Sequence, residues 1–323
     1  MDNARRILWG LVPLLAVLMG LSLLLSRFAG LHWPDTPLDW QLVTDLRLPR
    51  TLLAVLAGAA LGMSGAALQG LLRNPLADPG VLGISGSAVL GAVVVMYFGV
   101  SSVLSVWVPL AGMGSALLAL VVVLALVGRR PDALWIILAG AAINALTAAL
   151  LTLALNLAPN PFAVQDVVFW MMGGFDNRTL THALMVVLPV VAGMTLMWRQ
   201  ARALDVLTLG PEAAHSLGVD VVRVQRHVVV GTALAVGAVV SVCGGIGFVG
   251  LVVPHLVRPL VGWKPGATLW PSALAGAGLT LLADLVVRAL PLATELKVGV
   301  VTALIGTPFF LWLILRGRGR WTG

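Results

Sequence analysis

Eight uncharged, apolar stretches dominate the amino-acid sequence. A helix rises about 1.5 Å per residue, so it needs roughly 20 apolar residues to cross the hydrocarbon core of a bilayer. The stretches are residues 7–25, 51–72, 79–128, 133–165, 179–198, 228–254, 265–283 and 298–315. Residues 79–128 are long enough for two spans with a break near Ser101 and Ser102, and residues 228–283 hold three spans, one of them short and interrupted by prolines. We therefore predict an all-α polytopic membrane protein with about ten transmembrane helices.

The composition excludes most other classes of protein. Only 10% of the residues are charged and 59% are hydrophobic, whereas about a quarter of a soluble domain is charged. The net charge of +7 is typical of a membrane protein with basic cytoplasmic loops and does not require a nucleic-acid partner. A single cysteine, Cys243, excludes a disulfide framework, and the five histidines lack metal-ligand spacing. We expect no catalytic residues, no metal site and no cofactor.

Basic residues predict the orientation of the chain. The first stretch follows Arg5 and Arg6 and lacks the cleavage site of a signal peptide, so we interpret it as a retained span with a cytoplasmic N-terminus. Alternating the spans from there places twelve arginines on the cytoplasmic side: Arg5, Arg6, Arg73, Arg129, Arg130, Arg199, Arg202, Arg223, Arg226, Arg316, Arg318 and Arg320. Six basic residues fall on the outer side: Arg27, Arg47, Arg50, Arg178, Arg288 and Lys297. This excess of basic residues on the cytoplasmic side obeys the positive-inside rule. The rule does not explain the six basic residues on the outer side, so we look for another role for them.

The chain is similar to itself when it is shifted by 180 residues. The shift aligns Gly65 with Gly245, Gly70 with Gly250, and Pro79 with Pro259. We interpret the similarity as an inverted repeat, with copies at about residues 47–157 and 227–316, which is typical of transporters that open alternately to either side. The alternative is that glycine-rich membrane helices align by chance.

No segment of the sequence provides an energy source for transport. Neither Lys264 nor Lys297 is followed by Ser or Thr, so the nucleotide-binding Walker loop is absent. Asp284 is the only acidic residue well inside a predicted span, and Arg288 follows one helical turn later, which favours an ion pair over a proton relay. We therefore expect a transporter that is driven by ATP hydrolysis on a separate cytoplasmic subunit.

Five segments give the chain a resemblance to a known family. In order they are residues 47–50 (RLPR), 65–80 (including GAALQG and RNPLADPG), 169–174 (FWMMGG), 245–255 (GIGFVGLVVPH), and Asp284 and Arg288 with 299–306 (GVVTALIG). Together they resemble the permease subunits of ABC importers for iron chelates, haem and cobalamin, the type II importers. Residues 171–175 (MMGGF) look most like a permease for cobalamin, whereas siderophores and haem are commoner substrates in this family.

The resemblance implies a single transmembrane permease domain over residues 1–323 that pairs as a homodimer in the lipid of a bacterial inner membrane. Two copies of an ATP-binding subunit would bind the cytoplasmic face, and a periplasmic substrate-binding protein would bind the outer face. Both termini would be cytoplasmic. The fifth and tenth helices, at about residues 134–156 and 298–315, would line the substrate path.

The resemblance also implies site residues. Arg47, Arg50 and Arg288 would dock the binding protein, because a guanidinium group pairs well with a carboxylate. The alternatives are interfacial snorkelling and, for Arg288, pairing with Asp284.

A cytoplasmic loop at about residues 204–227 would couple the chain to the ATPase. Pro211 and Gly218 predict the start and stop of a short helix there. The coupling residues would be Glu212, Ala213, Ala214, Leu217 and Gly218. The alternative is an ordinary connector.

The translocation path would include Asn144, Thr147, Met171 and Met172. Methionine is flexible and polarizable and suits a wall along which a bulky ligand slides. Packing between helices is the alternative for all four residues. At the level of function, the alternatives to an ABC importer permease are an ion-coupled secondary transporter and a membrane-embedded enzyme or structural subunit.

Overall fold

The computed structural model describes residues 2–26, 30–98, 106–128, 133–158, 160–290 and 295–318. Its elements are α1 (Asp2–Leu24), β1 (Leu25–Ser26), β2 (Gly30–Leu31), α2 (Pro37–Leu42), η1 (Val43–Arg47), α3 (Leu48–Leu71), η2 (Pro79–Leu82), α4 (Ile84–Phe98), α5 (Trp107–Val127), α6 (Ala133–Asn156), α7 (Pro161–Met171), α8 (Leu180–Arg199), α9 (Ala201–Leu207), α10 (Pro211–Ser216), α11 (Val221–Cys243), α12 (Val249–Val257), η3 (Arg258–Val261), α13 (Pro265–Ala289) and α14 (Val298–Arg318). Among these residues, seven helical segments are long and apolar enough to cross a membrane, and three shorter apolar helices accompany them. The prediction of an all-α polytopic membrane protein is confirmed.

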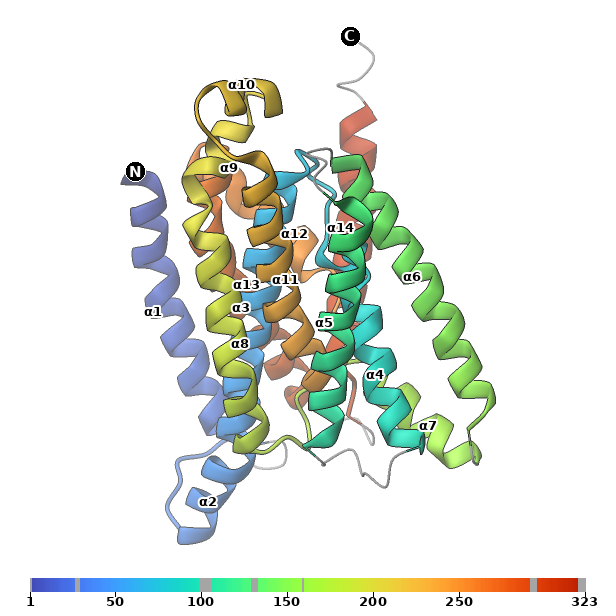
Figure 1. Ribbon diagram of the computed structural model, residues 1–323. Coiled ribbons are helices and arrows are strands. Elements are labelled where there is room, and N and C mark those ends of the chain that lie inside the picture. The colour runs from blue at the N-terminus through green and yellow to red at the C-terminus, as the bar shows by residue number, and fades with distance from the viewer. Residues whose placement is uncertain are drawn as a thin grey trace.

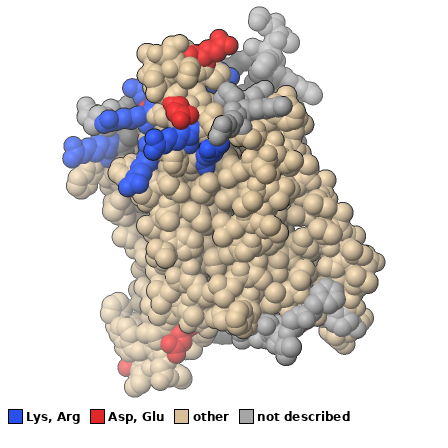
Figure 2. All heavy atoms as spheres, viewed as in Figure 1, with Lys and Arg blue, Asp and Glu red and all other residues tan. Residues whose placement is uncertain are grey.

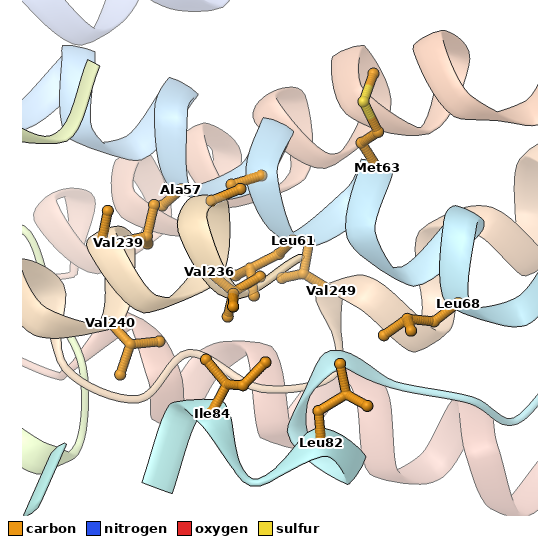
Figure 3. Packing of buried hydrophobic residues seen from close by; sticks show 14 of the residues in the cluster. Ala57, Leu61, Met63, Leu68, Leu82, Ile84, Val236, Val239, Val240 and Val249 are labelled. Carbon is orange, nitrogen blue, oxygen red and sulfur yellow. The ribbon is translucent and has the colours of Figure 1, made fainter. Parts of the chain in front are cut away.

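The helices form one bundle around α3 and α11 (Figure 1). These two helices run in opposite directions, and most of their side chains are buried. Leu61 of α3, Leu82 of η2 and Val236 of α11 belong to the buried apolar cluster, and Figure 3 shows them turned toward one another. The outer helices, such as α1, expose many apolar side chains, as expected of a lipid-facing surface.

Small residues let α3 approach its neighbours closely. A Cβ atom at Gly58 would overlap the backbone of Gly276 in α13, and one at Gly65 would overlap the carbonyl group of Gly250 in α12. Because two backbones in contact leave no room for side chains, glycine is required at these positions. Gly65 and Gly250, two of the glycines that the 180-residue shift aligns, therefore lie in backbone contact.

The two ends of the bundle differ in charge. The start of α1, the segments α9 and α10, and the end of α14 lie at one end, whereas α2 lies at the other (Figure 1). Lys and Arg side chains gather around α9 and α10, as Figure 2 shows.

The sequence predicts one uncharged stretch at residues 133–165 and a break near Ser101 and Ser102. Residues 133–165 form two helices, α6 and α7, because the Asn160 side chain caps α7 and Pro161 occupies its first turn. The break expected near Ser101 and Ser102 lies outside the described residues.

Candidate functional site

An ionic network joins α3, α13 and the segment before α14 at the end of the bundle that carries α2. Asp284 is 0% exposed and accepts hydrogen bonds from Arg50 Nε at 2.8 and 3.1 Å. Arg50 Nη2 lies 2.8 Å from Asp284 Oδ1 and also pairs with Glu295, and Arg288 Nε lies 3.2 Å from Asp284 Oδ2. One buried carboxylate thus pairs with both arginines, and the more exposed Glu295 supplies the second negative charge that balances them.

The same network reaches α1. Arg288 donates to the Ser22 carbonyl oxygen at 2.9 Å and pairs with the Ser22 hydroxyl at 2.6 Å. Arg47 donates to the Leu23 carbonyl oxygen at 2.9 Å. The structure therefore brings the three arginines predicted for docking to one place, where each already has a partner within the chain.

Three loop segments meet next to this network. The Gly174 amide donates to the Cys243 carbonyl oxygen at 2.8 Å, and the Gly299 amide donates to the Gly173 carbonyl oxygen at 3.1 Å. Gly173 and Gly244 have φ values of 73°, which favour glycine, and a Cβ atom on either would overlap a neighbouring backbone oxygen. The loops before α8, after α11 and before α14 are consequently locked together.

A salt bridge closes this junction. Lys297 Nζ lies 2.7 Å from Asp176 Oδ2. Burial raises the pKa of Asp176, but the hydrogen bond and charge of Lys297 outweigh burial and leave the pKa below its usual value. Burial lowers the pKa of Arg178, two residues further along.

A pocket of about 510 Å³ opens beside the junction. Met172 and Gly245 line one side, and the first turns of α14, from Gly299 to Pro308, line the other. No charged side chain lines it among the described residues. Such a surface can pass a bulky ligand without holding it by charge.

Of the four predicted path residues, only Met172 lines this pocket. Met171 packs against the buried cluster. The Asn144 side-chain amide donates to the Gly80 carbonyl oxygen at 2.8 Å, and the Thr147 hydroxyl donates to the Ile143 carbonyl oxygen at 2.8 Å in its own helix. Asn144 therefore fixes the turn η2 against α6.

The predicted coupling loop forms two short helices, α9 and α10. Gly210 has a φ of 105°, Pro211 occupies the first turn of α10, and Gly218 has a φ of 83°. Leu217 is exposed, whereas Ala214 is buried. The loop ends at residue 220 rather than 227, because Asp220 caps α11 and the helix begins at Val221.

Sequence reasoning missed several contacts that position these segments. Glu295, Asp176 and Asp205 had no assigned role, yet Asp205 accepts the Gly266 amide at 2.7 Å and so ties α9 to the start of α13. The signal for Glu295 was its place two residues before the outer Lys297.

The family model of the FecCD transport family matches residues 8–316. The chain belongs to the FecCD transport family. The hemin transport system permease protein HmuU of Yersinia pestis is 40% identical over 292 residues, covering 88% of this chain and 86% of that protein. The vitamin B12 import system permease protein BtuC of Klebsiella pneumoniae is 39% identical over 328 aligned residues, covering 98% and 96%.

A solved structure agrees with this assignment to the FecCD family. A metal-chelate type ABC transporter in an inward-facing conformation superposes with a TM-score of 0.88 at 30% identity, covering 97% of this chain and 99% of that one. The prediction that the chain is a permease subunit of an ABC importer, and not an enzyme, is confirmed.

Proposed function

We propose that this permease moves an iron chelate, such as a ferric siderophore or haem, or cobalamin from the periplasm to the cytoplasm. The similarity to haem and vitamin B12 permeases carries the proposal. The uncharged pocket beside Met172 and α14 supports it, because a large chelate must pass without being trapped.

The end of the bundle that carries α9 and α10 faces the cytoplasm of a bacterial inner membrane. The positive-inside rule supports this orientation, since Lys and Arg side chains gather there (Figure 2). Both termini are cytoplasmic in this orientation. Among the described residues, the seven long apolar helices and the three shorter ones support the proposal of ten spans.

The chain forms one permease domain with an inverted repeat. The antiparallel α3 and α11 correspond in the two halves, and each half continues through a proline-containing turn, η2 or η3. Each turn ends on a left-handed glycine, Gly83 or Gly262. A second copy of the chain completes the path, which α6, α14, Asn144, Thr147, Met171 and Met172 border.

A periplasmic binding protein docks over Arg47, Arg50 and Arg288. Glu295 supports this role, because it shows that a carboxylate at this surface can reach Arg50, as a carboxylate of the binding protein would. An Arg50→Glu variant should bind the binding protein at least about tenfold more weakly, since like charges then meet. An unchanged affinity would remove the docking role.

Two ATP-binding subunits engage α10 through the coupling residues Glu212, Ala213, Ala214, Leu217 and Gly218. The exposed Leu209 and Leu217 flank α10 and supply apolar surface for such a partner. The contact between Asp205 and Gly266 gives a route by which movement of the partner reaches α13.

Reconstituted vesicles test the proposed function. The permease, its ATPase and its binding protein should together transport labelled haem, ferric siderophore or cobalamin, and a hydrolysis-deficient ATPase should abolish uptake. Uptake by the permease alone that ionophores abolish would instead identify an ion-coupled carrier. The structure argues against that outcome, because Asp284 is paired with two arginines.

A further inference from the structure

A groove of about 570 Å³ lies between the end of α8, α9 and the start of α11. Arg199, Arg202 and Arg223 line it, together with apolar side chains such as Leu196 and Val206. The groove thus combines a basic floor with an apolar border, at the end of the bundle where basic side chains gather (Figure 2).

The three guanidinium groups make no hydrogen bond or ion pair within the part of the chain that the structure describes. Asp220 is the one acidic lining residue, and its carboxylate caps α11 by accepting the Arg223 amide at 3.0 Å. His227 also lines the groove, and its Nδ1 is buried without a hydrogen-bond partner in the described residues. Three unpaired cations around one space repel each other unless an anion enters.

Tryptophan places this groove at the membrane surface. The exposed Trp198 directly precedes Arg199 and packs edge-on against Trp270, with ring centroids 6.5 Å apart. Tryptophan prefers the headgroup level of a bilayer, where its ring is partly apolar and its N–H group is solvated. The basic floor therefore lies at the depth of lipid phosphates, and the apolar border lies toward the acyl chains.

We infer that this groove binds the phosphate headgroup of an anionic phospholipid. Basic pockets between membrane helices on the cytoplasmic side are suited to such headgroups. The apolar border favours a lipid over free phosphate. Of the five proposed coupling residues only Gly218 lines the groove. An ATPase subunit is disfavoured as the occupant, because the exposed Leu209 and Leu217 that would receive it flank α10 outside the groove.

Lipid retention by the purified permease tests the inference. Native mass spectrometry should detect bound dioleoylphosphatidylglycerol but little dioleoylphosphatidylcholine. Replacing Arg199, Arg202 and Arg223 with Gln should weaken retention of phosphatidylglycerol at least about tenfold, since each cation adds to the attraction. Replacing the same three residues with Lys should preserve most of it, and this variant also checks folding.

A matched control separates the groove from general surface charge. Replacing Arg5, Arg6 and Arg226 with Gln removes the same charge from this end of the molecule outside the groove, and retention should be unchanged. Equal loss in both triple variants would overturn the inference. The inference would also be overturned if glycerol 1-phosphate displaced bound phosphatidylglycerol as strongly as the lipid itself does. It would equally be overturned if the Gln variant of Arg199, Arg202 and Arg223 lost ATPase binding but kept its lipid retention.

Discussion

Replacing Asp284 with Asn should destabilise the permease more than any other single change in the outer network. Asp284 is 0% exposed and compensates two guanidinium groups whose side chains are only 13% and 6% exposed, those of Arg50 and Arg288. Asparagine keeps the size and one acceptor oxygen but removes the negative charge. Both arginines would then remain buried beside a neutral group.

The expected loss in the free energy of unfolding is about 3 to 5 kcal/mol, the cost of removing one partner from a buried ion pair. Glu295→Gln is the matched control, since it removes the other carboxylate that contacts Arg50. Because the Glu295 side chain is 21% exposed, solvent screens that pair and the expected loss is about 1 kcal/mol or less.

Unfolding of the purified permease in mixed micelles, followed by circular dichroism against sodium dodecyl sulfate, measures both losses. An Asp284→Asn and Arg50→Gln double variant should recover at least about 1 kcal/mol relative to the sum of the single variants, because the Arg50 charge is then no longer buried beside a neutral group, although Arg288 still lacks its carboxylate partner. Equal losses for Asp284→Asn and Glu295→Gln would refute the reasoning from burial.

Three further predictions concern other parts of the molecule. Gly65→Ala should severely reduce the yield of folded protein, because the new Cβ atom would overlap the Gly250 carbonyl group. Gly114→Ala should be tolerated, since a Cβ atom there meets nothing within 4 Å. Size-exclusion chromatography after detergent extraction compares the two yields. Lys297 holds the pKa of Asp176 below the usual value of 3.8. The Tm of the natural chain should therefore exceed that of Asp176→Asn by a constant amount from pH 7 to about 5, and the difference should fade as the pH falls below 3.8. A Tm difference that grows in acid would contradict this reasoning. Leu217→Asp should uncouple ATP hydrolysis from transport at unchanged permease Tm, and transport at the natural rate would exclude an apolar contact there.

The all-helical, membrane-spanning class was readable from the sequence because lipid imposes a simple rule of length and apolarity. Boundaries set by caps were harder to predict. The helix α11 begins at Val221, because the Asp220 carboxylate caps it. The uncharged run of this helix begins only at Val228, seven residues later, so the run alone could not predict the start.

The site was only partly predictable. The three outer arginines were recognised because they oppose the charge rule, and they do converge. Their carboxylate partners were not all recognised, because Glu295 lies 245 residues from Arg50 and only the tertiary fold brings the two together. Asn144 and Thr147 could not be assigned by type, since an amide or a hydroxyl in a membrane helix can bond a backbone as readily as it can line a path.

The length of α13 has a mechanical consequence. The helix has 25 residues, which corresponds to about 37 Å, and it connects the hydrogen bond from Gly266 to Asp205 with the ion pairs of Asp284. A displacement of α9 would act on the start of α13. Because α13 is a stiff helix, it would transmit the displacement to the ion pairs of Asp284 at the opposite membrane surface. Unless α13 bends at Pro271, the segments that it contacts at the two membrane surfaces cannot move independently.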